Sequence, residues 1–314
     1  MWYLKMFAGV YKMTKQTKPL GSPLGSSLKT KPLRTEPLVS VYMPSKNRGP
    51  ILARAIDSVL AQDYANIELV IVDDGSTDDT PALLAHYQSE HNNIRYFRHE
   101  TSKGVAAARN HAINQCQGEF VTGLDDDDQF CPGRITSLMA VYDDRYAFVC
   151  SSVIWDFGQR QQVADDKGMV FNLEQQLSYN HATTQVLVKR ERLLAIDGFD
   201  TELIARIDYD GWTRLMVQYG DALRISEPSY ILSRNDGLER VTTSGRAVEG
   251  NRQFVAKHRH LMNSKNLTNH AFWQMYIQKQ PFSVKALIGQ LSAGYVLIKL
   301  KYFIRINFLP NWHR

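Results

Sequence analysis

The sequence has little of what a disulfide scaffold, a zinc site or a membrane span requires. Its 314 residues include only three cysteines, Cys116, Cys131 and Cys150, which are too few for a disulfide framework and lack zinc-ligand spacing. This favours a reducing, cytoplasmic location. No run of 18 uncharged apolar residues occurs, so no transmembrane helix is predicted. The first ten residues are too short and mixed for a signal peptide.

Several nucleotide-binding and hydrolase motifs are also absent. No GxGxxG follows the first expected strand, which argues against a dinucleotide site. No GxxxxGK[ST] loop and no GxSxG elbow occur, which argues against a P-loop protein and an α/β-hydrolase. The composition, with 44% hydrophobic and 22% charged residues, is that of a globular protein.

Charge is distributed unevenly along the chain. Residues 1–37 hold seven bases and one acid, 38–240 hold 19 bases and 30 acids, and 241–314 hold 11 bases and one acid. We therefore expect a flexible basic leader over 1–37, an acidic main domain over 38–240 and a basic, mainly helical C-terminal region over 241–314. This pattern suits a metal-dependent enzyme working beside an anionic surface, and solvated basic tails without a partner are the alternative.

Short apolar segments alternate with segments of helical periodicity between 38 and 153. The expected strands cover 39–43, 67–72, 94–97, 119–124 and 148–153, and the expected helices cover 51–60, 76–87, 105–115 and 132–142. The second helix is expected to open with a capping box from Ser76 to Asp79. This alternation predicts an α/β fold with a mainly parallel sheet covered on both faces. Ligands bind such sheets outside the carboxyl ends of the strands.

Acidic residues follow two of these strands. A run of four aspartates, 125–128, comes directly after an apolar strand, and adjacent carboxylates repel one another unless a cation neutralises them. Oxygen ligands select Mg²⁺ or Mn²⁺, and extended backbone places Asp125 and Asp127 on the same side. The alternative is a solvated acidic turn or a helix cap. Asp73 and Asp74 end another strand, where a carboxylate can accept from a nucleobase or a ribose hydroxyl.

The segment Asp208-Tyr209-Asp210 opens an amphipathic stretch far from the other acids in sequence. A carboxylate at this position is a candidate general base, and ordinary helix N-terminal acids are the alternative. His258 and His260 lie in a basic stretch without partner acids, so we expect them to be surface residues.

These segments, in this order, resemble family 2 glycosyltransferases. The resemblance rests on VSVYMPSKNR at 39–48, AIDSVLAQ at 55–62, ELVIVDDGSTD at 68–78, GVAAARN at 104–110, QGEF at 117–120, LDDDD at 124–128 with Pro132, GFD at 198–200 and DYDGWTR at 208–214. It implies a GT-A fold and a hexosyltransferase-type enzyme. Such an enzyme moves a sugar from a nucleotide-sugar to a glycan or glycolipid acceptor, with inversion and a divalent metal. It also suggests lipopolysaccharide or polysaccharide synthesis in a bacterium, and no nucleic-acid partner.

The resemblance implies roles for individual residues. The nucleotide-sugar would lie beside Pro44, Ser45, Lys46, Asn47, Asp74, Lys103, Arg109, Asp125 and Asp126. Asp74 would contact the base, Asp127 and Asp125 would hold the metal, and Asp208 would deprotonate the acceptor hydroxyl. A single base with in-line attack implies inversion, because retention needs a second carboxylate as nucleophile.

The chain departs from the family pattern at several positions. Lys46 stands where the family often has Tyr or His, and Ile207 stands where Glu often precedes the base. The usual Arg-x-His segment is replaced by 233–244, in which Arg234 or Arg240 could contact phosphate. Two other functions stay open. A sugar nucleotidyltransferase is one, although 44–49 is a poor match to its glycine-rich loop, and a non-catalytic sugar-nucleotide or membrane scaffold is the other.

Residues 283–309 alternate apolar runs with lysine and arginine. This pattern is typical of a basic amphipathic helix, which either lies on an anionic membrane or packs on the domain. Attachment to the inner face of the cell membrane would suit a lipid-linked acceptor.

Overall fold

The computed structural model describes residues 36–164, 167–234 and 245–309. The predicted leader, apart from its last two residues, and Arg240 lie outside these residues. The strands are β1 (Val39–Ser45), β2 (Ile67–Asp73), β3 (Ile94–Arg98), β4 (Phe120–Gly123), β5 (Gln129–Phe130), β6 (Val149–Asp156), β7 (Gln161–Ala164), β8 (Met169–Phe171), β9 (Leu187–Lys189) and β10 (Ala222–Ser233). The helices of this part are α1 (Gly49–Leu60), α2 (Thr80–Glu90), α3 (Val105–Gln115), α4 (Arg134–Val141), α5 (Leu173–Ser178), α6 (Arg190–Ala195) and α7 (Ile207–Tyr219).

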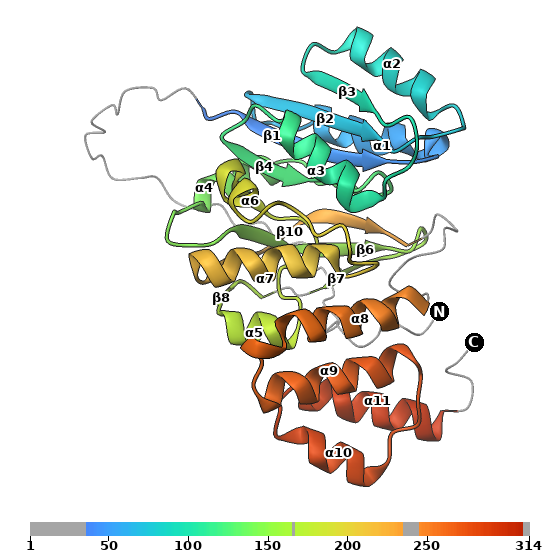
Figure 1. Cartoon of the computed structure of the whole chain (residues 1–314), viewed down its shortest axis with the longest axis vertical. Coiled ribbons are helices and arrows are strands. Elements are labelled where there is room, and N and C mark those ends of the chain that lie inside the picture. The colour runs from blue at the N-terminus through green and yellow to red at the C-terminus, as the bar shows by residue number, and fades with distance from the viewer. Residues whose placement is uncertain (1–35, 165–166, 235–244, 310–314) are drawn as a thin grey trace, which may run out of the picture.

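The strands form a single sheet in the order β3-β2-β1-β4-β9-β6-β10-β5, with β7 beside β6 and β8 beside β10. Parallel pairing joins β3, β2, β1 and β4, and it also joins β6 to β10 (Figure 1). The short strand β9 is antiparallel to β4 and β6 and connects these two parallel groups. The predicted α/β class with a mainly parallel sheet is confirmed.

The sheet is covered on both faces, as its apolar strands require. Alternate residues of β1 and β2 point to opposite faces, so Tyr42 and Val70 enter one core while Val41 and Leu69 enter the other. The first core is closed by α3, α6 and α7, and the second by α1, α2 and α4. Figure 1 shows α3 and α7 lying across the same face. Apolar contacts that exclude water hold both helices on the sheet.

The predicted capping box at the start of α2 is wrong. The helix begins at Thr80, and the side chain of its N-cap residue Asp79 makes no capping hydrogen bond. Asp78 Oδ1 instead accepts from the backbone N–H of Thr80 at 3.0 Å, and Asp73 accepts from the N–H of Ser76 at 2.9 Å. Residues 74–79 are therefore a turn after β2, because these short acidic side chains satisfy the loop's own donors.

The C-terminal part consists of helices where it is described: α8 (Gly245–His258), the 3-10 turn η2 (Arg259–Leu261), α9 (Ser264–Ile277), α10 (Val284–Leu291) and α11 (Val296–Phe308). The segment expected as one helix over 283–309 forms α10 and α11, because Gly294 and Tyr295 adopt positive φ angles of 85° and 54°. Phe272, Phe282 and Tyr302 join α9, α10 and α11 in a separate apolar core. The described helices include none that is both long and apolar enough to cross a membrane.

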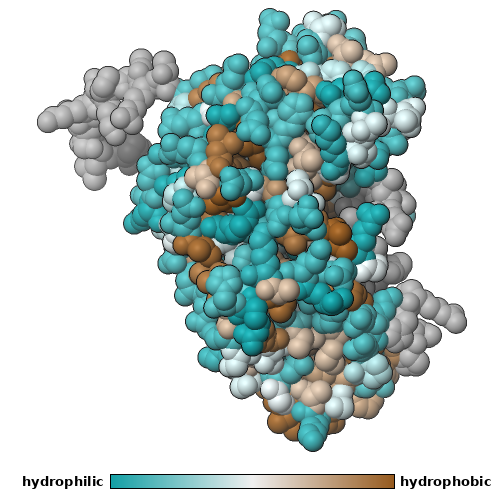
Figure 2. All heavy atoms as spheres, viewed as in Figure 1, coloured by the Kyte–Doolittle hydropathy of each residue, from teal (hydrophilic) through white to brown (hydrophobic). Residues whose placement is uncertain are grey.

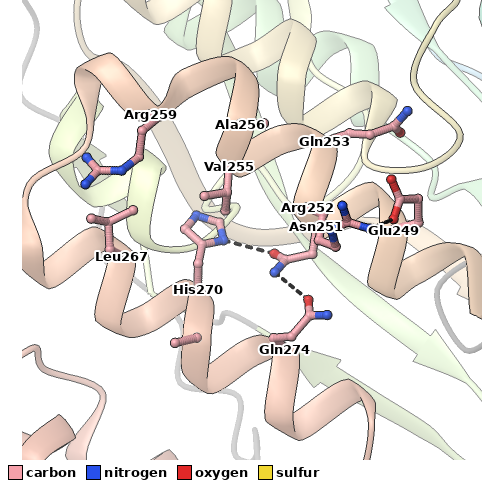
Figure 3. A pocket seen from close by; sticks show the side chains of 11 residues that line it. Glu249, Asn251, Arg252, Gln253, Val255, Ala256, Arg259, Leu267, His270 and Gln274 are labelled. Carbon is pink, nitrogen blue, oxygen red and sulfur yellow. Dashed lines mark hydrogen bonds and ion pairs between the residues drawn. The ribbon is translucent and has the colours of Figure 1, made fainter.

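A hollow of about 560 Å³ lies between α8 and α9 (Figure 3). His270 Nδ1 lies 3.0 Å from Asn251 Oδ1, and Asn251 Nδ2 donates to Gln274 Oε1 at 2.8 Å. Burial lowers the pKa of His270 to about 4, with the nearby Arg206 charge acting in the same direction. These bonds fasten the two helices to each other, so the polar groups of the hollow serve helix packing.

Candidate active site

The main cavity of the described residues, about 860 Å³, opens where β1, β2 and β4 end and α7 begins. The parallel register places Ser45 opposite Asp73, and Tyr42 opposite Gly123, so the residues after these strands meet at one edge of the sheet. The predicted site residues that line this cavity are Pro44, Ser45, Lys46, Asp74, Arg109, Asp125, Asp126, Asp127 and Asp208. The fold therefore brings together five segments separated by up to 164 residues.

Asn47 and Lys103, also predicted for the site, are not among the residues that line the cavity. Asn47 has a left-handed backbone with φ of 53°, and its Oδ1 accepts from the N–H of Thr77 at 2.8 Å. Its own N–H donates to Ser76 Oγ at 2.8 Å. Lys103 offers its backbone N–H to Asp74, and the residue is otherwise exposed. Both residues shape the loops at the cavity edge, and their contact with a ligand stays a prediction.

Arg109 joins the predicted base to a predicted metal ligand. Its guanidinium donates from Nη2 to Asp125 Oδ1 at 2.5 Å and from Nη1 to Asp208 Oδ1 at 2.8 Å. The Arg109 side chain is buried and lies over the Phe199 ring at 5.4 Å. Burial alone lowers the pKa of this guanidinium, but the charges of Asp125 and Asp208 outweigh it and hold the pKa well above its usual value. Arg109 is therefore a permanent cation that fixes the spacing of the two carboxylates.

The residue after Arg109 secures a second loop. Asn110 Oδ1 accepts from the N–H of Phe199 and its Nδ2 donates to the Phe199 carbonyl, both at 2.7 Å. Gly198 has φ of 64°, and a Cβ at this position would clash with the Asn110 side chain. Helix α3 therefore positions the carboxylates through Arg109 and the 198–199 turn through Asn110, which explains the adjacent Arg-Asn pair.

Asp74 is held by the turn that follows β3. Its carboxylate accepts from His99 Nδ1 at 2.8 Å, Ser102 Oγ at 2.6 Å, the N–H of Lys103 at 2.7 Å and the N–H of Gly104 at 2.8 Å. Burial alone raises the pKa of Asp74, but these hydrogen bonds outweigh it and lower the pKa to about 2. Asp74 is therefore ionised at neutral pH and fixes the wall of the cavity.

Asp126 points back toward the loop after β1. Its Oδ2 accepts from the N–H of Lys46 and its Oδ1 from Arg48 Nε, both at 3.3 Å. Burial raises the pKa of Asp126 to about 7, and the neighbouring charges of Asp127 and Asp125 add to this against the opposing effect of Arg48. Asp126 is thus partly protonated near neutral pH, chiefly because it is buried.

Asp128 is buried beneath the same turn. Its Oδ2 accepts from Tyr230 Oη at 3.0 Å and its Oδ1 from the N–H of Ser233 at 2.9 Å, so it links the turn to β10. Burial, followed by the charge of Asp127, raises the pKa of Asp128 well above its usual value. Arg54 donates to the Asp127 carbonyl at 2.9 Å, which fixes the backbone of the turn.

The remaining two acids of the run are suited to a hard divalent cation. The Asp125 side chain is 31% exposed, and Asp127 lines the cavity. Within the described ranges, no group of three or more His, Cys, Asp or Glu side chains is placed to hold a metal ion. Carboxylate oxygens fit Mg²⁺ or Mn²⁺, and Mg²⁺ is commonly held by one or two carboxylates together with substrate phosphates and water. The residues present fit such a shared site.

The prediction that His258 is a surface residue without a partner acid is wrong, whereas His260 is exposed as expected. His258 is buried, and its Nε2 lies 2.8 Å from Asp210 Oδ1. Asp210 is also paired with Arg214 at 2.8 Å and Lys257 at 2.9 Å. Burial alone raises the pKa of Asp210, but His258 and the two cations outweigh it and lower the pKa to about 2. This cluster joins α8 to α7, the helix that carries Asp208.

The far side of the cavity was not predicted from the sequence. We call it the distal wall, and define it as Tyr179, Asn180, Thr183, Arg206, Trp273 and Tyr276. Tyr179 and Trp273 pack with ring centroids 5.5 Å apart, although 94 residues separate them in the sequence. No short motif marks these residues, because the wall is assembled from segments around α5, α7 and α9.

Comparison with known sequences identifies relatives of the chain. The family model described as "Glycosyl transferase family 2" matches residues 40–199. The putative colanic acid biosynthesis glycosyl transferase WcaA of Escherichia coli (strain K12) is 32% identical over 272 residues, which are 83% of this chain and 95% of that protein. The GalNAc(5)-diNAcBac-PP-undecaprenol beta-1,3-glucosyltransferase of Campylobacter jejuni is 38% identical over 114 residues, which are 36% of this chain and 37% of that protein.

Solved structures show a similar fold. The structure of S. aureus TarS in complex with UDP-GlcNAc aligns with a TM-score of 0.63 at 20% identity, covering 86% of this chain and 81% of that chain. The mannosyltransferase PcManGT from Pyrobaculum calidifontis, in complex with GDP-Man and Mn²⁺, aligns with a TM-score of 0.52 at 20% identity, covering 86% and 73%. These likenesses confirm the predicted GT-A fold. Because the family model spans half of the chain and the E. coli relative aligns along nearly its whole length, the chain belongs to glycosyl transferase family 2 and is a glycosyltransferase.

Proposed function

We propose that the chain transfers a sugar, with inversion, from a nucleotide-sugar to a hydroxyl of a glycan or glycolipid acceptor. A UDP-sugar is the first candidate donor, because the S. aureus TarS structure is a complex with UDP-GlcNAc. Cell-surface polysaccharide or lipopolysaccharide synthesis is the proposed setting, in keeping with the name of the E. coli relative. A lipid-linked acceptor is suggested by the name of the Campylobacter relative.

The observation that carries the proposal is the double contact of Arg109. It holds Asp125, beside the proposed metal and donor site, and Asp208, the proposed base, in one cavity. Asp208 Oδ1 accepts from Arg109, and within the described residues Asp208 Oδ2 accepts no hydrogen bond. This oxygen is available to take the proton of an acceptor hydroxyl as the hydroxyl attacks the sugar.

The remaining carboxylates of the cavity support inversion. Retention would require a second carboxylate placed as a nucleophile beside the sugar carbon. Asp74 has both oxygens occupied by the 99–104 turn, and Asp128 has both occupied by β10. Asp125 and Asp127 are assigned to the metal, with one oxygen of Asp125 also bound to Arg109, and Asp126 is bound to the loop after β1. We therefore assign one acid, Asp208, to proton transfer.

On the donor side, we propose that Pro44, Ser45, Lys46, Asn47, Asp74, Lys103, Arg109, Asp125 and Asp126 surround the nucleotide-sugar. Asp125 and Asp127 would hold Mg²⁺ or Mn²⁺, which would neutralise charge on the departing diphosphate. Lys46 is at the cavity edge and would add a positive charge near the phosphates. Asp74 would face the base while keeping the 99–104 turn in place.

We keep the division into a catalytic domain over 38–240 and a basic C-terminal region over 241–314 as a proposal. It is supported by the separate apolar core of α9, α10 and α11.

We also propose a cytoplasmic location at the inner face of the membrane. The supporting observation is the apolar surface at the C-terminal end of the molecule, visible as brown and tan spheres in the lower part of Figure 2.

The deciding experiment is a calorimetric titration of UDP, with GDP as a control, in the presence and absence of Mn²⁺. We expect wild-type protein to bind UDP in a metal-dependent manner and Asp127→Asn to lose the metal-dependent part. Asp143→Asn is the matched control, because this exposed acid pairs only with the exposed Arg145. Absence of binding of both nucleotides under every metal condition would contradict the proposal. Pyrophosphate release from a nucleoside triphosphate and a sugar phosphate would instead indicate a nucleotidyltransferase.

A further inference from the structure

Arg206 is an unusual residue on the distal wall. It precedes α7, lies two residues before Asp208 and adopts a left-handed backbone with φ of 61°. For a side chain other than glycine, this conformation is strained and persists only when its surroundings hold it. The holding contacts come from α8: Gln253 Oε1 accepts from the N–H of Ile204 at 3.0 Å, and Gly250 leaves room for Ala205, which a Cβ would displace.

The guanidinium of Arg206 has no charged partner. Among the described residues, its side chain makes no ion pair and no hydrogen bond. It makes a cation–π contact with the Tyr209 ring, 5.6 Å from the centroid. Burial lowers the pKa of Arg206, and only Tyr209 opposes this. Arg109, the buried arginine of the same cavity, binds two carboxylates. A partly buried cation of this kind is costly unless a ligand supplies the missing anion.

The neighbours of Arg206 suit a carbohydrate. Tyr179 and Trp273 line the cavity with aromatic side chains, against which sugar rings can pack. Asn180 and Thr183 add polar side chains, whose present hydrogen bonds run to Gln176, the Thr183 carbonyl and the Ala182 carbonyl. The donor side of the same cavity is rich in aspartate, which repels anions in the absence of a metal. Arg234 and Arg246 also line this cavity, and Arg206 is the cation that lies among the aromatic residues of the distal wall.

We propose that Arg206 is a specificity-determining residue that binds a negatively charged group of the acceptor, a sugar carboxylate or a phosphate, while the aromatic residues of the distal wall hold the adjacent sugar ring. This rests on the proposed function, because it assigns the acceptor to the side of Asp208 away from the donor. A guanidinium matches both groups through paired hydrogen bonds, so either chemistry can satisfy it.

The test measures acceptor-analogue binding by calorimetry with UDP and Mg²⁺ present to fill the donor site. One arm compares phenyl β-glucuronide with phenyl β-glucoside, and the other compares citronellyl diphosphoglucose with citronellyl glucoside. We expect wild type to bind the anionic analogue more tightly in one arm, by about tenfold or more. Hydrogen bonds to charged groups contribute a free energy of this size. A preference in the first arm identifies a carboxylate, and one in the second identifies a phosphate.

Arg206→Gln should abolish this preference, and Arg206→Lys should restore part of it, because lysine keeps the charge without the paired donors. Arg252→Gln is the matched control, since Arg252 is an exposed arginine of α8 paired with Glu249. Equal binding of charged and neutral analogues by wild type, or a preference that survives in Arg206→Gln, would overturn the inference. So would a large loss of UDP affinity in Arg206→Gln, which would place Arg206 with the donor.

The two proposals fail in different ways. If wild type binds no nucleotide, the donor assignment fails, and the analogue titrations repeated without UDP still show whether Arg206 selects an anion. If UDP binds but no anion is preferred, the glycosyltransferase site stands and the role of Arg206 is refuted.

Discussion

At the scale of single residues, the site depends on how one arginine divides its hydrogen bonds. Arg109 occupies one oxygen of Asp125 and one of Asp208, which leaves the second oxygen of each for a ligand. Its charge is permanent, so the spacing of the two carboxylates does not vary with pH in the physiological range. A preorganised pair of this kind avoids rearrangement during the reaction.

Asp208→Asn should separate catalysis from donor binding. Asparagine keeps the shape and the hydrogen bond from Arg109 but cannot accept a proton, so we expect sugar transfer to fall by about 10²- to 10⁴-fold. The affinity for UDP and metal should stay close to that of wild type. Initial rates of UDP release from UDP-sugars with acceptor measure the first quantity, and calorimetry measures the second. Transfer at the wild-type rate would show that another group is the base.

Much of the site could be predicted because its residues lie in short, ordered motifs. Asp74 and Asp208 were inferred from local patterns, Pro44 and Arg109 from the family resemblance of such motifs, and the structure places all four around one cavity. The side chain of Asn47 was harder to place, because its left-handed backbone directs Oδ1 to Thr77, and the sequence does not reveal that angle. Local patterns identify reactive residues better than they identify where each side chain points.

The distal wall could not be predicted for a different physical reason. Tyr179 and Trp273 come from helices far apart in the chain, and aromatic residues at such positions are usually core residues. Their exposure to a cavity depends on how α9 docks against the segment after α5. That docking is determined by hydrogen bonds such as Trp273 Nε1 to the Ser178 carbonyl at 3.1 Å, which no periodicity predicts.

At the scale of elements, α8 supports the helix that carries the proposed base. The side chains of His258, Lys257 and Arg214 converge on Asp210, which is fully buried. The sequence predicted two amphipathic helices but not this contact, because His258 and Asp210 are 48 residues apart. The strands β7, β8 and β9 were likewise not predicted, because they are short and belong to a segment without clear alternation.

Asp210→Asn should destabilise the protein, because it removes the fully buried carboxylate that pairs with Arg214, Lys257 and His258. We expect the free energy of unfolding at pH 7 to fall by about 3 kcal/mol, the low end for breaking a buried ion pair. Urea unfolding followed by circular dichroism measures this change. Asp143→Asn serves as the control for loss of a surface acid and should change stability by less than about 0.5 kcal/mol.

The same variant should change the response to acid. The pKa of Asp210 is lowered in the folded protein from 3.8 to about 2, so its ionised form stabilises the fold above pH 4. This contribution, about 2 kcal/mol, is lost as pH falls from about 4 to about 2. Wild type should therefore lose more stability than Asp210→Asn over this interval. Parallel curves for the two proteins would show that Asp210 is not the group responsible.

At the scale of the whole molecule, charge and exposed apolar surface coincide at the C-terminal end. No acidic residue occurs after Glu249, whereas the preceding domain is acidic overall. One face of α11 carries four exposed apolar side chains at helical spacing: Leu297, Leu300, Ile304 and Phe308. Lys301 and Arg305 lie within the same helix. The opposite side of α11 packs through Tyr302 onto α9 and α10, so packing accounts for this face, and membrane contact stays a prediction for the exposed face.

This arrangement predicts binding of α11 to an anionic membrane surface. Each buried apolar side chain contributes about 1.5–3 kcal/mol, and each lysine or arginine near anionic lipid about 1 kcal/mol. We expect wild-type protein to float with phosphatidylglycerol liposomes, and we expect recovery to fall as salt screens the charges. Leu297→Gln combined with Ile304→Gln should reduce partitioning by about 100-fold, because both side chains are exposed and their loss does not disturb the core.

The choice of variant matters for this experiment. Truncation near Phe282 would remove Tyr302 and open the apolar core of the C-terminal helices, so a loss of binding could reflect unfolding. Point substitutions on the exposed face avoid this problem. Val217→Gln, on the exposed face of α7, removes a similar apolar side chain from another surface and should leave flotation unchanged. Equal recovery of the double variant and wild type at low salt would assign the apolar face of α11 to a role other than membrane contact.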